Sequence, residues 1–198
     1  MNHLFGILFS PTDEWEKVRQ DSSSVAGHYL KFLLWAGLAA PVAWYYGSTT
    51  IGWQLGDRVI RLTSDSAAQI MVLFYLAILV CTAFLGYMIH WMSETYEAKN
   101  STLGKGVSIA GYTLAPLFVC GLIGFYPILW LDILLGCVAA AYTVYLLYVG
   151  VPIVMEIPSE RGFLFASAMV GVGLVICAAL LGATVILWEL GAMPVFTD

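Results

Sequence analysis

Side chains that could perform chemistry are few in this 198-residue chain, and the clearest group is one histidine with two glutamates. His90, Glu94 and Glu97 are spaced by four and three residues, so they share one face if a helix continues through Glu97. An imidazole with two carboxylates can bind zinc or manganese, and His28 could add a fourth ligand. No second half of a ligand motif is evident, so a solvated helix end is the competing interpretation. We therefore expect neither a metal nor a cofactor.

Asp132 is a second candidate, because it is bracketed by two long apolar stretches. A carboxylate inside a membrane is a functional candidate by default, for example in proton or ion handling. However, Pro127 and Trp130 precede it and favour a turn near the membrane surface. At that position Asp132 could instead cap the following helix and interact with its dipole.

Three tyrosines follow on the same stretch, and their hydroxyls need partners in an apolar setting. Tyr142, Tyr145 and Tyr148 recur every three residues and predict a polar seam within a helical bundle. Interhelical hydrogen bonds explain such a seam, and so does the lining of a substrate path. Tyr112 and Pro116 form a further polar position with a helix break, which either opens a cavity or only shapes the helix.

The sequence stretches that could be taken for catalytic motifs lack the required residues or spacing. The sequence Gly104-Lys105-Gly106 lacks the spacing of a phosphate-binding loop. The histidines are His3, His28 and His90, which form no credible Ser-His-Asp set. The cysteines lie in apolar stretches without short-range pairing, as expected for packing residues rather than disulfides or zinc ligands. We predict that the protein is not an enzyme.

The elements that must position these residues follow from composition. The chain is 61% hydrophobic and 11% charged with a net charge of −5, whereas soluble domains carry about 25% charged residues. Five intervals between charged residues exceed the roughly 20 residues that a membrane-spanning helix needs. This pattern excludes a soluble enzyme, a nucleic-acid binder and a disordered chain, and its segments are too long for an outer-membrane barrel. It predicts an all-α integral membrane protein, a five-helix transmembrane bundle with spans near 29–46, 67–92, 107–126, 131–151 and 163–187.

The segment before the first span predicts a short amphipathic helix. Ser10 is placed to cap it, Pro11 to occupy its first turn, and Trp15 and Val18 to share its apolar side. Such a helix either anchors to the membrane surface or docks a cytosolic partner. The predicted division is therefore 1–28 as an N-terminal segment, 29–190 as the transmembrane domain and 191–198 as a tail.

Basic residues predict the orientation, because their excess marks the cytoplasmic side. Five spans place the termini on opposite sides of the membrane. The side of the N-terminus then carries most of the cations, and the other side carries Arg58 and Arg61. We expect a cytoplasmic N-terminus and a periplasmic C-terminus.

The last span carries a stripe of mainly small residues, which recur at steps of three and four along one helix face. The stripe consists of Ser167, Gly171, Leu174, Ala178 and Gly182. Small residues let helices approach closely in a bilayer, so the stripe predicts helix packing, within the bundle or across a dimer.

Short motifs along nearly the whole chain resemble bacterial inner-membrane members of the Ypt-interacting-protein (Yip) family. They are Phe9-Ser10-Pro11 with Glu14-Trp15, Thr49 to Trp53 with Gly56-Asp57, Gly111-Tyr112 with Ala115-Pro116-Leu117, Gly124 to Pro127, and Tyr142 to Tyr148 with Gly150 and Pro152. The resemblance implies a five-span fold in the inner membrane. Eukaryotic relatives are non-enzymatic trafficking proteins that bind small GTPases and other membrane proteins, and they carry a long cytosolic region before the first span. This chain has about 28 residues there, so GTPase binding is not implied.

Two functional hypotheses follow. The first is a non-enzymatic membrane protein that associates with itself, with lipid or with another membrane protein, and not with nucleic acid. The second is a small oligomeric transporter or channel with a tyrosine-lined polar path.

Overall fold

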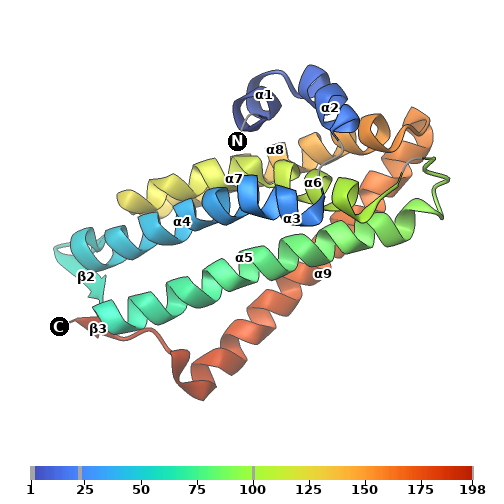
Figure 1. The fold of residues 1–198 in the computed structure, drawn as a ribbon. Coiled ribbons are helices and arrows are strands. Elements are labelled where there is room, and N and C mark those ends of the chain that lie inside the picture. The colour runs from blue at the N-terminus through green and yellow to red at the C-terminus, as the bar shows by residue number, and fades with distance from the viewer. Residues whose placement is uncertain (1–2, 22–23, 100, 198) are drawn as a thin grey trace.

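The computed structural model describes residues 3–21, 24–99 and 101–197, and Figure 1 shows their arrangement. Five helical segments are long and apolar enough to cross a membrane, so the predicted all-α membrane bundle is confirmed. Their bounds are Val25–Ile51, Ser64–Ser93, Leu103–Phe125, Leu129–Met155 and Ser159–Ala192. Each predicted span lies within a residue of one of these segments or inside it, because a long apolar stretch in a bilayer must satisfy its backbone hydrogen bonds internally.

Three of the spans contain irregular turns. The first runs through α3 (Val25–His28), the π-helical η1 (Tyr29–Leu33), α4 (Leu34–Tyr46) and the π-helical η2 (Gly47–Ile51). The third runs through α6 (Leu103–Thr113), α7 (Ala115–Cys120) and the 3-10 helix η3 (Gly121–Phe125). The second and fourth are the continuous helices α5 (Ser64–Ser93) and α8 (Leu129–Met155). The fifth joins α9 (Ser159–Leu187) to η4 (Trp188–Ala192).

Pro116 causes the break in the third span. It has no backbone N–H to donate to Tyr112, and the N–H groups of Leu117 and Phe118 both bond to the carbonyl of Leu114. The break separates α6 from α7. It therefore changes the course of the helix most enclosed by the others.

One end of the bundle carries a small sheet, and we call it the hairpin end. The strand β1 (Trp53–Leu55) pairs antiparallel with β2 (Arg58–Leu62), and β2 pairs antiparallel with β3 (Phe196–Thr197). This pairing returns the C-terminus to the start of α5 (Figure 1). The opposite end, where residues 94–102 and 156–158 connect spans, is the entry end.

Glycines allow close contact between spans. A Cβ at Gly106 would lie 2.3 Å from the carbonyl oxygen of Gly86, and a Cβ at Gly86 would meet the backbone of Val107 at 2.7 Å. Because neither residue has a side chain, α5 and α6 pack backbone against backbone near the entry end.

The last span departs from the expectation for its small-residue stripe. No other part of the described chain lies within 4 Å of a Cβ built at Gly171 or Gly182, and Ala178 is exposed. The helix α9 instead packs through Gly162, Phe165 and its neighbours near the entry end, and then diverges from α5 (Figure 1). The prediction that the stripe packs within the bundle is therefore wrong from Gly171 onward and holds only for Ser167, which contacts α8. Small residues permit close approach, but the geometry of the connections decides which helix comes near.

The N-terminal segment also differs from a single surface helix. It forms α1 (Leu4–Phe9) and α2 (Pro11–Gln20), and both pack on the side of the bundle (Figure 1). Pro11 occupies the first turn of α2 as predicted, whereas the side chain of Ser10 makes no capping bond. Trp15 and Val18 do share one side of α2, but that side is buried in the core.

Candidate functional site

The N-terminal helices cover a cluster of polar side chains, which we call the N-terminal cluster: His3, Glu14, Lys17, His28 and Tyr112. Glu14 lies at its centre and is only 5% exposed. Its carboxylate accepts a hydrogen bond from Lys17 Nζ at 2.8 Å and contacts His3 Nδ1 at 2.5 Å. Charged groups are rarely buried without such partners, because desolvation of an unpaired charge is costly.

Electrostatics in the cluster favour the ionised form of Glu14. Burial opposes ionisation, but hydrogen bonds and positive charge from Lys17 and His3 outweigh it and hold the pKa of Glu14 below its ordinary value of 4.5. In return, the hydrogen bond and charge of Glu14 raise the pKa of Lys17 above its ordinary 10.5. The contact of Glu14 with His3 ties the start of α2 to the residue before α1, and Lys17 supports Glu14 from within α2.

His28 and Tyr112 form the floor of the cluster. The His28 ring is 3% exposed and meets the Tyr112 ring edge-on at a centroid distance of 4.7 Å. His28 Nδ1 contacts Ser108 Oγ at 3.4 Å, whereas its Nε2 has no hydrogen-bond partner among the described residues. A Cβ at Gly111 would lie 2.4 Å from that Nε2, so only glycine leaves room for the imidazole here. His28 is therefore a packed interior residue and not part of a group with His90.

Two residues of the predicted polar path hold the N-terminal helices in place. The hydroxyl of Tyr142 donates to the carbonyl oxygen of Leu8 at 2.8 Å. The indole of Trp15 lies on Gly150, where a Cβ would approach its ring within 2.5 Å. Together with Tyr112, which His3 also contacts edge-on, these residues form a seat for α1 and α2.

The remaining tyrosines point elsewhere. The Tyr148 hydroxyl is hydrogen-bonded to Ser167 Oγ at 2.8 Å, so it joins α8 to α9. Tyr145 is exposed and stacks on Tyr142. The hydroxyls of Tyr142 and Tyr148 thus bond to different neighbours, as interhelical packing predicts.

Asp132 lies in the first turn of α8, four residues after Ile128, which occupies the N-cap position. Its carboxylate oxygens have no partner at ordinary hydrogen-bond geometry in the part of the chain that the structure describes, but an electrostatic interaction with the backbone of Ile128 remains. The role of Asp132 as a cap therefore stays a prediction, and its charge lies at the positive end of the helix dipole. Tyr142 is about 15 Å away along α8, at 1.5 Å per residue.

Prolines at the two ends of the fourth span have packing roles. Pro127 lies beside Gly47, where a Cβ would meet its ring at 2.9 Å. Pro152 lies against Gly162 of α9, where a Cβ would approach it within 2.6 Å. Both contacts depend on a glycine opposite the proline ring.

The predicted histidine–glutamate face does not form. The helix α5 ends at Ser93, so Glu94 and Glu97 do not continue the face of His90. His90 Nδ1 is hydrogen-bonded to Ser101 Oγ, and Glu97 pairs with Arg161. Among residues 3–21, 24–99 and 101–197, no group of three potential metal-ligating side chains is close enough to hold an ion.

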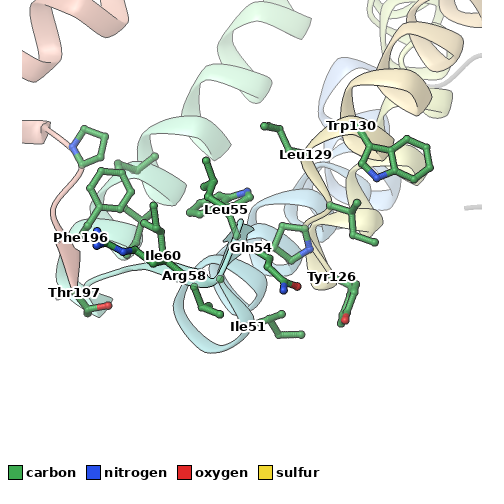
Figure 2. Close-up of a pocket in the computed structure, with 18 of the residues that line it drawn as sticks. Ile51, Gln54, Leu55, Arg58, Ile60, Tyr126, Leu129, Trp130, Phe196 and Thr197 are labelled. Carbon is green, nitrogen blue, oxygen red and sulfur yellow. The ribbon is translucent and has the colours of Figure 1, made fainter.

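A wide, open depression of about 1520 Å³ lies at the hairpin end. Phe196 and Thr197 border one side, Tyr126 and Trp130 the other, and β1 lies between them (Figure 2). Mostly apolar and aromatic lining with Arg58 is typical of a surface at the membrane–water boundary.

Sequence reasoning missed the role of Glu14 and His3. Glu14 was visible only as an acid in the first turn of a helix, with Lys17 one turn later. That spacing is also common on solvated helices, so it carried no sign of burial.

Comparison with known proteins decides the family. The Yip1 domain model matches residues 5–180, which is most of the chain. The chain belongs to the Yip1 family. This Yip1-family protein is also 35% identical over 192 residues to the inner membrane protein YohC of Escherichia coli K12, covering 96% of this chain and 98% of that protein. The same values hold for YohC of E. coli O6:H1, and no solved structure matches the chain. The family resemblance is confirmed, and this Yip1-family chain is an inner-membrane protein.

Proposed function

We propose that this protein is non-enzymatic and acts by association within the bilayer, with a second copy of the chain as its partner. The observation that carries the proposal is the exposed face of α9. Ala178 is exposed, and both Gly171 and Gly182 have open space around them. A helix face of small residues is suited to close contact with another helix, and this chain supplies none at that position.

The geometry of α9 favours a helix over lipid as the occupant of that face. Lipid tails contact large apolar side chains as well as small ones. Two helices in a bilayer, by contrast, associate mainly through the van der Waals contacts that a close approach of their backbones allows. The exposed stripe lies on the part of α9 that diverges from α5 (Figure 1). A second α9 can therefore approach it without displacing a span of its own bundle.

The polar residues support a non-enzymatic role. Glu14 is bonded to Lys17 and His3, His28 contacts Ser108 of α6, and His90 is bonded to Ser101. Their positions are explained by packing and by hydrogen bonding. The proposed orientation has a cytoplasmic N-terminus and a periplasmic C-terminus, on the basis of the basic residues on the N-terminal side.

A pair of glycine variants tests the association. Gly171 and Gly173 both have open space around them, but they point about 160° apart on the helix. By size-exclusion chromatography with light scattering in detergent, the wild-type protein is expected to have the mass of two chains. Gly171→Leu should reduce it to one chain, because the larger side chain keeps the helices apart, and Gly173→Leu should leave the dimer intact.

A cysteine on the stripe provides an independent check in membranes. Ala178 is exposed on the stripe, and Cys137 is exposed on α8. In single-cysteine variants with the other cysteines changed to serine, oxidation should cross-link chains through Ala178→Cys and not through Cys137. A single-chain wild-type mass together with no cross-link at Ala178→Cys would refute association through α9.

A further inference from the structure

The short helix α1 crosses two neighbouring spans at one level of the bundle. At its N-cap, the ring of His3 meets the ring of Tyr112 in the third span at a centroid distance of 5.5 Å. Near its end, the carbonyl oxygen of Leu8 accepts the hydrogen bond of Tyr142 in α8 at 2.8 Å. Tyr112 and Tyr142 both lie near the middle of the spans that carry them. The helix α1 is therefore packed beside the middle of the bundle and not at its end (Figure 1).

The length of α8 gives the depth of this level in the bilayer. Trp130 is 68% exposed at the hairpin end, among aromatic side chains typical of a membrane–water boundary. Tyr142 lies about 18 Å from Trp130 along the helix, and Gly150 lies about 12 Å further on. Because the hydrocarbon core of a bilayer is about 30 Å thick, its second boundary falls near Gly150 or beyond it. Tyr142, and α1 with it, therefore lies about 12 Å inside the hydrocarbon, counted from the entry end.

The composition of α1 suits this depth. The helix has the sequence LFGILF, without a charged residue, and Ile7 is buried against the bundle. Phe5 and Phe9 are 70% and 81% exposed, so two aromatic rings protrude from the molecule. Val138, one turn of α8 nearer the hairpin end than Tyr142, is exposed as well. Acyl chains match such an apolar surface, whereas contact with water would be unfavourable.

The following helix α2 leads from this depth to the boundary. Trp15 lies on Gly150, about 12 Å nearer the entry end than Tyr142. The exposed charges of the N-terminal helices lie on α2, among them Asp13 and Lys17. An uncharged α1 and a charged α2 thus match the two levels at which these helices lie.

We propose that α1 is a re-entrant helix, which enters the leaflet at the entry end and binds its acyl chains through Phe5 and Phe9. The pairing of His3 with Glu14 fits this position, because charged groups inside a membrane are almost always paired. The bond from Tyr142 to Leu8 fits it too, because a backbone carbonyl has no water to bind at this depth. This proposal is independent of the proposed dimer, since it concerns α1 and not the stripe on α9.

Spin labels at matched positions test the depth of α1. Single cysteines carry the label in the full chain, with the native cysteines changed to serine, in vesicles of phosphatidylethanolamine and phosphatidylglycerol. Phe5→Cys and Phe9→Cys are compared with two exposed reference positions, Val138→Cys inside the hydrocarbon and Thr95→Cys in the connection at the entry end. The labels on α1 should collide with oxygen as often as the label at Val138. Their accessibility to a water-soluble nickel complex should be several-fold lower than at Thr95.

Two results would overturn the re-entrant position. Nickel accessibility on α1 equal to that at Thr95 would place the helix in water. Low accessibility to both nickel and oxygen would show that a second copy of the chain or another protein covers α1 in place of lipid.

A second measurement reads the depth directly. A fluorescent label on Phe9→Cys should be quenched more strongly by lipids brominated near the middle of their acyl chains than by lipids brominated near the headgroup. The label on Thr95→Cys should show no such preference. Stronger quenching at Phe9 by the bromines near the headgroup would restrict α1 to the membrane surface and refute the proposal.

Discussion

At the scale of single residues, the most informative side chain is a buried carboxylate. Glu14 lies between His3 and Lys17 and has almost no exposed surface. A buried ion pair is weak evidence for stability, but removal of one partner is costly when the other loses its hydrogen bond. Glu14 therefore serves to fix the position of α2 more than to strengthen the bundle.

This arrangement predicts a stability that depends on pH. Since the pKa of Glu14 is lower in the folded protein, its contribution is present above pH 4.5 and is lost as pH falls through the lowered value. Glu14→Gln should lower the free energy of unfolding by about 1.5–3 kcal/mol at neutral pH, the value of a hydrogen bond to a charged group. Thermal unfolding in detergent between about pH 3 and about pH 7 measures both effects.

The control for Glu14 is its neighbour Glu16, which pairs with Arg19 at the surface. Glu16→Gln should change stability by less than about 0.5 kcal/mol. If Glu14→Gln keeps the acid dependence of the wild-type protein, other carboxyl groups cause it.

At the scale of elements, hydrogen bonds over a long sequence separation close the hairpin end. Ser66, in the first turn of α5, donates to the carbonyl oxygen of Met193 at 3.3 Å and accepts from the N–H of Val195 at 3.0 Å. Thr63 N–H also bonds the Val195 carbonyl oxygen. One serine thus connects the start of the second span to the tail after the fifth.

We predict that Ser66→Ala loosens this tail. The substitution leaves the Val195 N–H without its acceptor, at a cost of about 1–3 kcal/mol. Faster amide hydrogen exchange at Val195 and easier proteolysis of the C-terminus are the expected results. The control is Ser64→Ala, two residues earlier at an exposed position, which should leave amide exchange at Val195 unchanged. Equal effects of the two variants on that exchange would contradict the role of Ser66.

At the scale of the whole molecule, charge distribution predicts the orientation in the membrane. Alkaline phosphatase fused after Asp198 should be active and a fluorescent protein there should be dark, because the C-terminus is expected outside the cytoplasm. The same reporters inserted after Lys99 should behave in the opposite way. A fluorescent fusion at Asp198 together with inactive phosphatase would show that the C-terminus is cytoplasmic and would contradict the predicted orientation.

The sequence by itself determined the number and extent of the spans and the family. Burial of an apolar helix in a bilayer is a local requirement, so it can be read from the spacing of charged residues and from length. Motifs such as Gly111-Tyr112 and Ala115-Pro116-Leu117 carried the family because they are also local.

Only the tertiary structure decided what each span and side chain contacts. The sequence pattern of Trp15 and Val18 was the same whether they faced lipid or α8, and the stripe on α9 was the same whether or not a helix covered it. These choices depend on contacts between residues far apart in the chain, such as Tyr142 with Leu8 and Trp15 with Gly150, and helical periodicity specifies a face without specifying its partner.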